Sequence, residues 1–268
     1  MHGRAGRVRQ LMLKYGIRPS KRLGQNFMVD EHYISKIAKT VNGAETVLEI
    51  GMGLGDLTSS IRNNVNWLIT CDLDPKVRRV YSDMAAGWVN VDFISCDGRM
   101  PPLRAVDSVV SNIPYAETSS IIIALLTKTS FKNAVLTLQK EVAERLMALP
   151  GTENYGRLSV MVQCAADVEL IDVVPPTAFI PRPKVYSAII KMNRKKECID
   201  LGLLEKFTGK VFTQPNKVLR KVVSHFYGKE AVQYIDIDKI NKRVYELSPS
   251  EIAVIINALG DRILYPLR

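Results

Sequence analysis

The run Ser111-Asn112-Ile113-Pro114-Tyr115 contains the residue types best suited to chemistry in this chain. An aromatic amine, such as the exocyclic amine of adenine, is a poor nucleophile because its lone pair is delocalised into the ring. The side-chain carbonyl of Asn112 and the backbone carbonyl of Ile113 or Pro114 can accept the amine protons and direct the lone pair at an electrophilic methyl group. Tyr115 offers a face for base stacking, and Pro114 restrains the backbone. The run predicts transfer to an aromatic amine, and the alternative is an ordinary turn.

A glycine-rich loop, Gly51-Met52-Gly53-Leu54-Gly55, follows the apolar run Thr46 to Ile50 and precedes a helical pattern. Glycines such as Gly51 and Gly53 let a ligand approach the backbone, and the first amides of a helix bind polar or anionic groups. The spacing is G-x-G-x-G and differs from the G-x-G-x-x-G of dinucleotide-binding folds. The loop therefore predicts a cofactor site, with a merely tight turn as the alternative.

Two carboxylates, Asp72 and Asp97, follow the next two predicted strands. Asp72 can accept hydrogen bonds from both ribose hydroxyls of an adenosine-bearing ligand, and Asp97 can accept one from the adenine amine. The alternative for each is a solvated acidic residue in a loop. Asp72 and Asp74 together could also suggest a metal ion, but no third ligand is evident, and we expect no metal.

The elements that must position these residues alternate between strands and helices, which is the α/β pattern. We expect strands at 46–50, 67–71, 89–94, 106–110, 134–138, 168–174 and 185–192, and helices at 75–84, 119–127, 139–149 and 156–166. Beyond the charged stretch 191–196, the segments 201–225 and 250–259 have helical spacing. The sequence predicts a Rossmann-like domain with a mostly parallel sheet over residues 1–194, and a small all-α C-terminal domain over 195–268.

The chain has 268 residues with a formal net charge of +10, and the excess positive charge lies at its two ends. Residues 1–40 carry nine basic and two acidic side chains, and residues 182–268 carry 17 and nine, whereas the middle of the chain is acidic. This distribution favours a nucleic-acid partner held at the periphery. The alternative is that the basic ends only keep the protein soluble.

Membrane insertion and secretion are both disfavoured. The longest apolar run, Ile121 to Leu126, is far shorter than the 18 or so residues of a spanning helix. The basic segment Met1 to Gln10 is followed by no apolar h-region, so we expect a cytoplasmic protein. The four cysteines, at positions 71, 96, 164 and 198, have no CxxC spacing. They are predicted to be buried reduced thiols, with neither a zinc site nor a disulfide framework.

Six ordered stretches resemble the ribosomal RNA adenine N6,N6-dimethyltransferases of the small-subunit type. The stretches, which run almost from end to end of the chain, are Lys21 to Phe27, Val47 to Thr58, Asn112 to Tyr115, Gln139 to Leu146, Tyr155 to Met161 and Pro175 to Ala188. The resemblance implies dimethylation of two adjacent adenines in a hairpin loop of small-subunit ribosomal RNA, within a pre-ribosomal particle. It also implies a role in ribosome biogenesis, and we expect a monomer.

The resemblance further implies that S-adenosylmethionine is the methyl donor. Donor-contacting positions of the relatives correspond here to Asn26, Met28, Gly51, Gly53, Asp72, Asp97 and Asn112. The implied catalytic residues are Asn112, Pro114, Tyr115 and Phe179. Phe179 would sandwich the target adenine opposite Tyr115, and the alternative for Phe179 is a core aromatic. An adenine inside a helix could not reach Asn112, so the base must be unstacked or lie in a loop.

Three departures from the family pattern stand out. Met52 replaces a proline in the glycine loop, the stretch Ala116-Glu117-Thr118 after the catalytic run differs from the usual one and contains an acid, and Thr213 to Arg220 is poor in arginine. Three rival functions stay open: a large-subunit adenine methyltransferase, a ribosome-assembly factor with dispensable catalysis, and a DNA amine methyltransferase. Tyr155 to Met161 favours the small-subunit type, and the roughly 70 residues of helical tail leave little room for a DNA-recognition domain.

Overall fold

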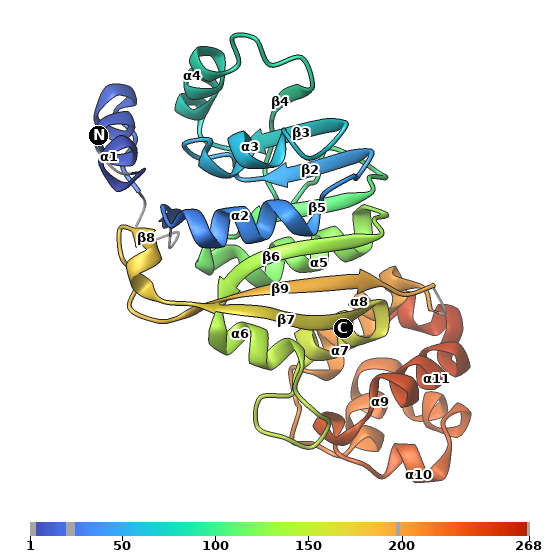
Figure 1. The fold of residues 1–268 in the computed structure, drawn as a ribbon. Helices are drawn as coiled ribbons and strands as arrows, with labels where there is room; N and C mark the ends of the chain where they lie inside the picture. Colours follow the sequence, from blue (N-terminus) through green and yellow to red (C-terminus); the bar gives the residue numbers. More distant parts are fainter. Residues whose placement is uncertain (1–3, 20–24, 197–198, 267–268) are drawn as a thin grey trace. The chain divides into compact units, whose positions relative to one another are not determined.

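A seven-stranded mixed sheet forms the centre of the fold in the computed structural model, which describes residues 4–19, 25–196 and 199–266. Helices cover both faces of this sheet, with α2 and α5 on opposite sides (Figure 1). The strands, in their spatial order, are β4 (Val91–Ser95), β3 (Trp67–Asp72), β2 (Thr46–Ile50), β5 (Ser108–Asn112), β6 (Asn133–Gln139), β9 (Ser187–Arg194) and β7 (Ala166–Val174). The first five run parallel and β9 is antiparallel to β6. This arrangement confirms the predicted Rossmann-like fold.

The central strands are buried on both faces, which explains why they read as continuous apolar runs. Four of the five residues of β2 are buried, and so are the middle five of the seven residues of β6. Because the strands are parallel, their carboxyl ends lie along one edge of the sheet. The glycine loop follows β2, Asp72 ends β3, and Asn112 ends β5, so the topology brings the predicted site residues together at that edge.

Several elements around the sheet were not predicted from the sequence. The helix α1 (Arg4–Tyr15) packs against α4 (Pro75–Met84), where the Lys14 amine and the Tyr15 hydroxyl both donate to Asp83 at 2.7 Å. The helix α2 (Glu31–Thr40) begins at Asp30, whose carboxylate accepts from the His32 backbone N–H. Short strands β1 (Phe27–Met28) and β8 (Phe179–Ile180) pair with each other in a separate two-stranded sheet. The remaining helices beside the sheet are α3 (Asp56–Ile61) and α5 (Thr118–Lys128).

The chain divides into two compact units. The first unit comprises Met1–Ala143 and Glu169–Asn193, and the second comprises Glu144–Val168 and Arg194–Arg268. The expected division had a single boundary after residue 194, whereas the second unit also takes in residues 144–168. Hydrogen bonds between segments far apart in the sequence connect these residues to the C-terminal helices: the Tyr155 hydroxyl donates to the Leu247 carbonyl, and the Gly151 N–H donates to the Tyr245 carbonyl, both at 2.8 Å.

The second unit is helical. Its helices are α7 (Arg157–Ala165), α8 (Leu201–Val211), α9 (Leu219–Tyr227), α10 (Ile237–Ile240) and α11 (Pro249–Leu259), and α6 (Lys140–Leu146) spans the boundary with the first unit. Helix α11 begins with Pro249 at its first position, and Ser248 and Glu251 form a reciprocal capping box there. The predicted helix over 201–225 is two helices, because the Pro215-Asn216 turn interrupts it. Within the described residues, no helix is long and apolar enough to cross a membrane.

Candidate active site

The glycine loop after β2 lies against the end of β3. The backbone N–H groups of Gly51 and Met52 both donate to the Cys71 carbonyl, at 2.8 and 3.1 Å. Gly51 has a φ of +85°, and a Cβ built on it would meet no atom within 4 Å. Gly53 also has a positive φ, and a Cβ there would lie 3.0 Å from the Phe27 ring. The loop therefore needs glycine for its backbone conformation, and at Gly51 it leaves open space for a ligand.

Asp72 is held in place by backbone groups. Its two carboxylate oxygens accept from the N–H of Gly53 and the N–H of Asp74, each at 2.9 Å. Burial raises the pKa of this carboxyl group, and the backbone hydrogen bonds oppose that rise. Asp74 instead caps α4 by accepting from the Lys76 N–H. Asp72 is thus oriented before any ligand arrives, with lone pairs on both oxygens still available.

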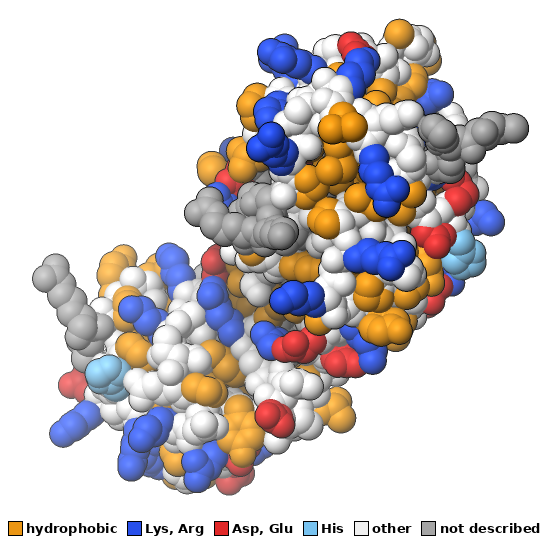
Figure 2. Space-filling model, turned by 90° about the vertical axis from the view of Figure 1, so that its left-hand side faces the viewer, with side chains coloured by type: hydrophobic (Ala, Val, Ile, Leu, Met, Phe, Trp, Pro, Cys, Tyr) orange, Lys and Arg blue, Asp and Glu red, His pale blue; other side chains and the backbone are white. Residues whose placement is uncertain are grey.

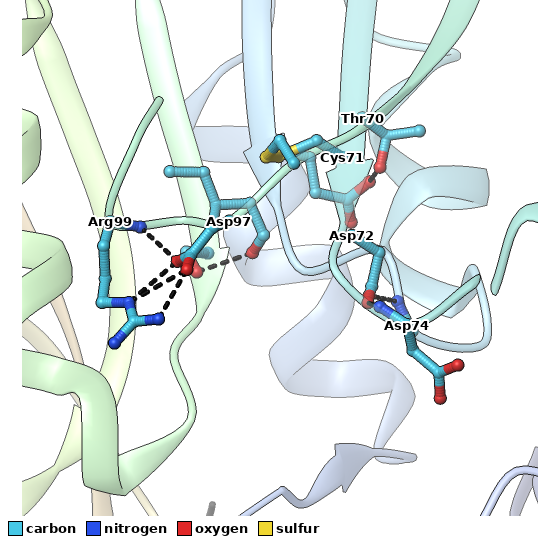
Figure 3. Close-up of a disulfide and its surroundings, with 11 residues drawn as sticks. Thr70, Cys71, Asp72, Asp74, Asp97 and Arg99 are labelled. Atoms are coloured by element: carbon cyan, nitrogen blue, oxygen red, sulfur yellow. Dashed lines mark hydrogen bonds and ion pairs between the residues drawn. A yellow bond between two sulfur atoms is a disulfide. The ribbon is translucent and has the colours of Figure 1, made fainter. Parts of the chain in front are cut away.

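Asp97 follows β4 and is engaged very differently (Figure 3). The Arg99 guanidinium donates to both of its oxygens, at distances between 2.6 and 3.1 Å, and the Arg99 backbone N–H donates to Oδ1 at 2.9 Å. These contacts lower the pKa of the Asp97 carboxyl, with the guanidinium as the largest cause. Arg99 also lies 3.7 Å from Glu117, the acid that follows the catalytic run.

Asn112 reaches the N-terminal segment. Its side-chain amide donates to the backbone carbonyl of Asn26 at 2.7 Å, which turns the Asn112 carbonyl oxygen away from Asn26. Asn26 and Met28 line the same pocket as Gly51 and Asp72. The sequence motif that begins at Lys21 is only partly visible, since residues 21–24 lie outside the described residues.

Pro114 begins a short 3-10 helix, η1 (Tyr115–Glu117). Its carbonyl accepts from the Glu117 N–H at 2.9 Å, which closes the turn. Of the two backbone carbonyls that the sequence offered as acceptors, that of Pro114 is therefore engaged in the turn, and that of Ile113 becomes the better candidate. The Tyr115 hydroxyl forms a 2.5 Å hydrogen bond with Ser187 of β9, which anchors the end of the side chain. Burial raises the pKa of Tyr115.

Phe179 is a core residue in this structure, which departs from the implied role of stacking on a base. Its side chain is 1% exposed and belongs to a hydrophobic cluster that includes Met28 and Ile189. The physical reason is the pairing of β8 with β1, in which Met28 lies opposite Phe179. The alternative of a core aromatic describes this conformation.

One pocket in the first unit is lined by all seven of the predicted cofactor residues. It is lined by Asn26, Met28, Gly51, Gly53, Asp72, Asp97, Asn112 and Pro114, together with Ile17, Cys71, Cys96, Arg99 and Glu117 among others. No group of three or more His, Cys, Asp or Glu side chains suited to a metal ion occurs in the part of the chain that the structure describes. The pocket thus offers glycine backbone, carboxylates and apolar walls.

The cysteine prediction is wrong for two of the four residues. Cys71 and Cys96 form a disulfide, with their Cα atoms 5.6 Å apart (Figure 3). Each cysteine directly precedes one of the two carboxylates, at the ends of the neighbouring parallel strands β3 and β4. Sequence spacing could not reveal the pair because strand pairing, not a local motif, brings the two residues together. The Cys164 thiol donates to the Pro249 carbonyl at 3.5 Å, and Cys198 lies outside the described residues.

Sequence reasoning also missed Glu49, Asp56 and Arg99. Glu49, in β2, is fully buried, and its Oε2 accepts from the hydroxyls of Thr58 and Thr70 at 2.6 and 2.7 Å. Burial raises the pKa of Glu49 to about 7. Asp56 starts α3 and pairs with Arg4 and Arg7 of α1. A charged residue inside the apolar run Thr46 to Ile50 was the available signal for Glu49, whereas nothing local identified the others.

Comparisons with known proteins agree on one family. The model of the family described as "Ribosomal RNA adenine dimethylase" matches residues 17–261. The probable ribosomal RNA small subunit methyltransferase A of Pyrococcus abyssi is 36% identical over 252 residues, which is 90% of this chain and 92% of that protein.

Two solved structures are similar over most of their length. A dimethyladenosine transferase from Plasmodium falciparum has a TM-score of 0.76 at 25% identity, with 88% of this chain and 98% of that one covered. The 23S rRNA methyltransferase ErmE has a TM-score of 0.62 at 25% identity, with 87% and 99% covered.

Proposed function

Since this chain belongs to the ribosomal RNA adenine dimethylase family, we propose that it methylates the exocyclic amines of two adjacent adenines in small-subunit ribosomal RNA. Each amine receives two methyl groups, and S-adenosylmethionine is the donor. The observation that carries the proposal is that residues of the glycine loop, the two carboxylates, Asn112 and Pro114 line one pocket.

The residues of that pocket fit S-adenosylmethionine, which supplies a methyl group on a positively charged sulfur. Gly51 leaves its backbone open to a ligand, and Asp72 presents oriented oxygens to the two ribose hydroxyls. Asp97 is the acceptor for the adenine amine of the donor. Asn26 and Met28 also line the pocket.

Asn112 and Ile113 hold the target amine. The Asn112 carbonyl oxygen, turned away from Asn26, accepts one amine proton, and the Ile113 backbone carbonyl accepts the other. The nitrogen lone pair then points along the line of the donor methyl, and alignment supplies most of the acceleration. The Tyr115 ring, held by Ser187, supports the base from one face. The ammonium product loses its proton to water.

The substrate must present an adenine outside a helix, as RNA hairpin loops do. Figure 2 shows the side of the molecule that is on the left in Figure 1. Lysine and arginine side chains are spread among exposed hydrophobic side chains there. Exposed apolar residues of the first unit include Leu73, Met100 and Tyr186. Such a mixture suits RNA, because basic groups contact phosphates and flat apolar groups contact unstacked bases. We propose a monomer that acts on a small-subunit precursor particle in the cytoplasm.

A large-subunit substrate is the second candidate, favoured by the likeness to the 23S rRNA methyltransferase ErmE. The likeness to the dimethyladenosine transferase is greater, with a TM-score of 0.76 against 0.62. The test is transfer of labelled methyl from S-adenosylmethionine to undermethylated small subunits, to large subunits and to naked RNA, followed by nucleoside analysis. Dimethyladenosine formed on small-subunit particles alone supports the proposal. Label on large subunits favours the second candidate, and tight particle binding without label favours an assembly factor.

Asn112→Ala tests the role of the catalytic run. We expect the variant to bind the donor within about threefold of the unchanged protein and to lose at least about 100-fold in single-turnover methyl transfer, the range of a lost transition-state contact. Asn63→Ala is a matched control, because Asn63 is an exposed asparagine just after α3 whose side-chain amide donates to the Ser59 carbonyl at 3.4 Å. Unchanged turnover in Asn112→Ala would contradict the assigned role.

A further inference from the structure

Arg99 lies at the edge of the donor pocket between two carboxylates. Its Nη2 donates to Asp97 at 2.6 Å, and its Nη1 lies 3.7 Å from Glu117. The Arg99 side chain is 52% exposed, and Asp97 and Glu117 are exposed to a similar degree, 28% and 30%. All three residues line the pocket. The guanidinium therefore has two available partners in similar surroundings.

Arg99 directs three N–H groups at the carboxylate of Asp97 (Figure 3). Oδ1 accepts from the Arg99 backbone N–H and Nε, and Oδ2 accepts from Nε and Nη2. A carboxylate offers about four lone-pair positions, and three N–H hydrogens of Arg99 share them, because the single Nε–H is divided between both oxygens. An adenine amine that donates to Asp97 therefore has to compete with the guanidinium for these positions. Asp72 differs, because each of its oxygens accepts from one backbone N–H.

The backbone at this turn leaves little room to adjust. A Cβ on Gly98 would lie 2.7 Å from Cγ2 of Ile50, so the chain already touches β2 there. The Met100 N–H donates to the Asp97 carbonyl at 2.7 Å and closes the turn. Release of Asp97 thus has to come from movement of the Arg99 side chain. Glu117 is the acceptor that lies within reach of that movement.

We propose that Arg99 competes with the adenine amine of the methyl donor for Asp97, and that Glu117 receives the guanidinium when the donor binds. This inference rests on the proposed function, because it requires Asp97 to accept that amine. It also gives Glu117, which departs from the family pattern, a role: Glu117 lies two residues after Tyr115 in the same short helix η1, which follows the catalytic run directly. Arg99 is accordingly a specificity-determining residue of the donor site.

The test is a set of dissociation constants measured by titration calorimetry on the full chain. The ligands are S-adenosylhomocysteine, which is the donor without its methyl group, and an analogue in which hydrogen replaces the adenine amine. We expect Arg99→Met to tighten S-adenosylhomocysteine about threefold, within the range of an exposed ion pair, and to leave the analogue unchanged. Glu117→Gln should weaken S-adenosylhomocysteine about threefold. In the double variant, Glu117→Gln should have no further effect.

Arg104→Met is the matched control, because Arg104 is an exposed arginine of the same unit that does not line the pocket. Weaker binding of both ligands by Arg99→Met would overturn the competition, since it would mean that Arg99 orients Asp97 or contacts the ligand directly. An equal effect of Glu117→Gln with and without Arg99 would overturn the part assigned to Glu117. Failure of the unchanged protein to bind S-adenosylhomocysteine would instead remove the proposed function itself, and the inference with it.

Discussion

Asp72 and Asp97 occupy matching places at the ends of neighbouring strands, yet their surroundings differ. Asp72 is held by the N–H groups of Gly53 and Asp74, and burial raises the pKa of its carboxyl. Asp97 is held mainly by the Arg99 guanidinium, which lowers the pKa of its carboxyl. Backbone N–H groups are held in place by the chain, whereas a half-exposed arginine side chain can rotate away from the carboxylate. The same residue type at equivalent positions therefore gives one fixed acceptor and one adjustable acceptor.

The difference extends into the layer below. Glu49 is fully buried in β2, next to β3, the strand that ends in Asp72. The hydroxyl groups of Thr58 and Thr70 donate to one of its carboxylate oxygens, and the other oxygen has no hydrogen-bond partner within the described residues. A buried carboxyl group in such a place favours its neutral form. The Asp97 side has Lys128 instead, an exposed cation whose amine donates to the Arg99 carbonyl at 3.1 Å. The fixed side is thus built from buried groups and the adjustable side from solvated charges.

Glu49→Gln should have the largest effect on this comparison. The folded pKa of about 7 lies above the ordinary value of 4.5, so between these values the folded protein keeps a proton that the unfolded chain loses. The stability of the unchanged protein should therefore fall as the pH rises from 4.5 to 7 and level off above 7. The variant lacks this slope, and the difference in unfolding free energy should shift in its favour by about 3 kcal/mol across that range. Urea unfolding at several pH values measures it.

Glu45→Gln is the control for that experiment, because Glu45 is an exposed glutamate just before β2. Parallel pH profiles for Glu49→Gln and the unchanged protein would show that Glu49 is ionised in the folded state. The buried carboxyl group beside the Asp72 strand would then be charged and not neutral.

Asp72→Ala should have the second largest effect. The substitution removes the acceptor for the ribose hydroxyls and leaves the Gly53 and Asp74 N–H groups without their partner. We expect the Kd for S-adenosylhomocysteine to rise about 50-fold, which corresponds to the loss of charge-assisted hydrogen bonds. Asp92→Ala, in β4 beside it, serves as a control because Asp92 is exposed and bonds to the Trp67 indole. A loss below about threefold would mean that the fixed carboxylate is not a donor contact.

Much of this framework could be predicted from the sequence, because it depends on local pattern. Buried parallel strands produce apolar runs, so Thr46 to Ile50 was placed with the bounds that the structure has. The glycine loop and the two aspartates follow strand ends, and the rule that parallel strands share a carboxyl edge brought them together. The proline at position 75 likewise predicted the start of the next helix, and the predicted range 75–84 matches the structure at both ends.

The remainder depends on contacts between distant segments. Three contacts join residues that no short sequence pattern relates. They are the Cys71–Cys96 disulfide, the hydrogen bond from Arg4 to Asp56 and the hydrogen bond from Asn112 to Asn26. Burial of Phe179 arises from the pairing of β8 with β1, two strands of two residues each, which is too short for an alternating pattern to show. Arg99 was missed because its importance lies in its partners and not in its type.

Asp97→Ala should have a smaller effect than Asp72→Ala. The adenine amine loses its acceptor, but Arg99 no longer has to be displaced, so part of the loss is offset. We expect the Kd for S-adenosylhomocysteine to rise about fivefold. The ratio of the two effects, measured in the same calorimetric series, sharpens the distinction between the fixed and the adjustable acceptor. Equal losses for the two variants would remove that distinction.

Reduction of the Cys71–Cys96 bond should have the smallest effect on donor affinity. The bond joins the two strand ends, but the β3 and β4 ladder already aligns them, and the Cys96 N–H donates to the Asp72 carbonyl at 3.1 Å. We therefore expect the Kd for S-adenosylhomocysteine to change less than about twofold in reductant, within the free energy of one weak contact. Thiol alkylation and mass measurement confirm the redox state, and Cys164→Ser gives a background with one fewer cysteine outside the Cys71–Cys96 pair. A tenfold change would show that the covalent bond, rather than the backbone ladder, sets the distance between the two carboxylates.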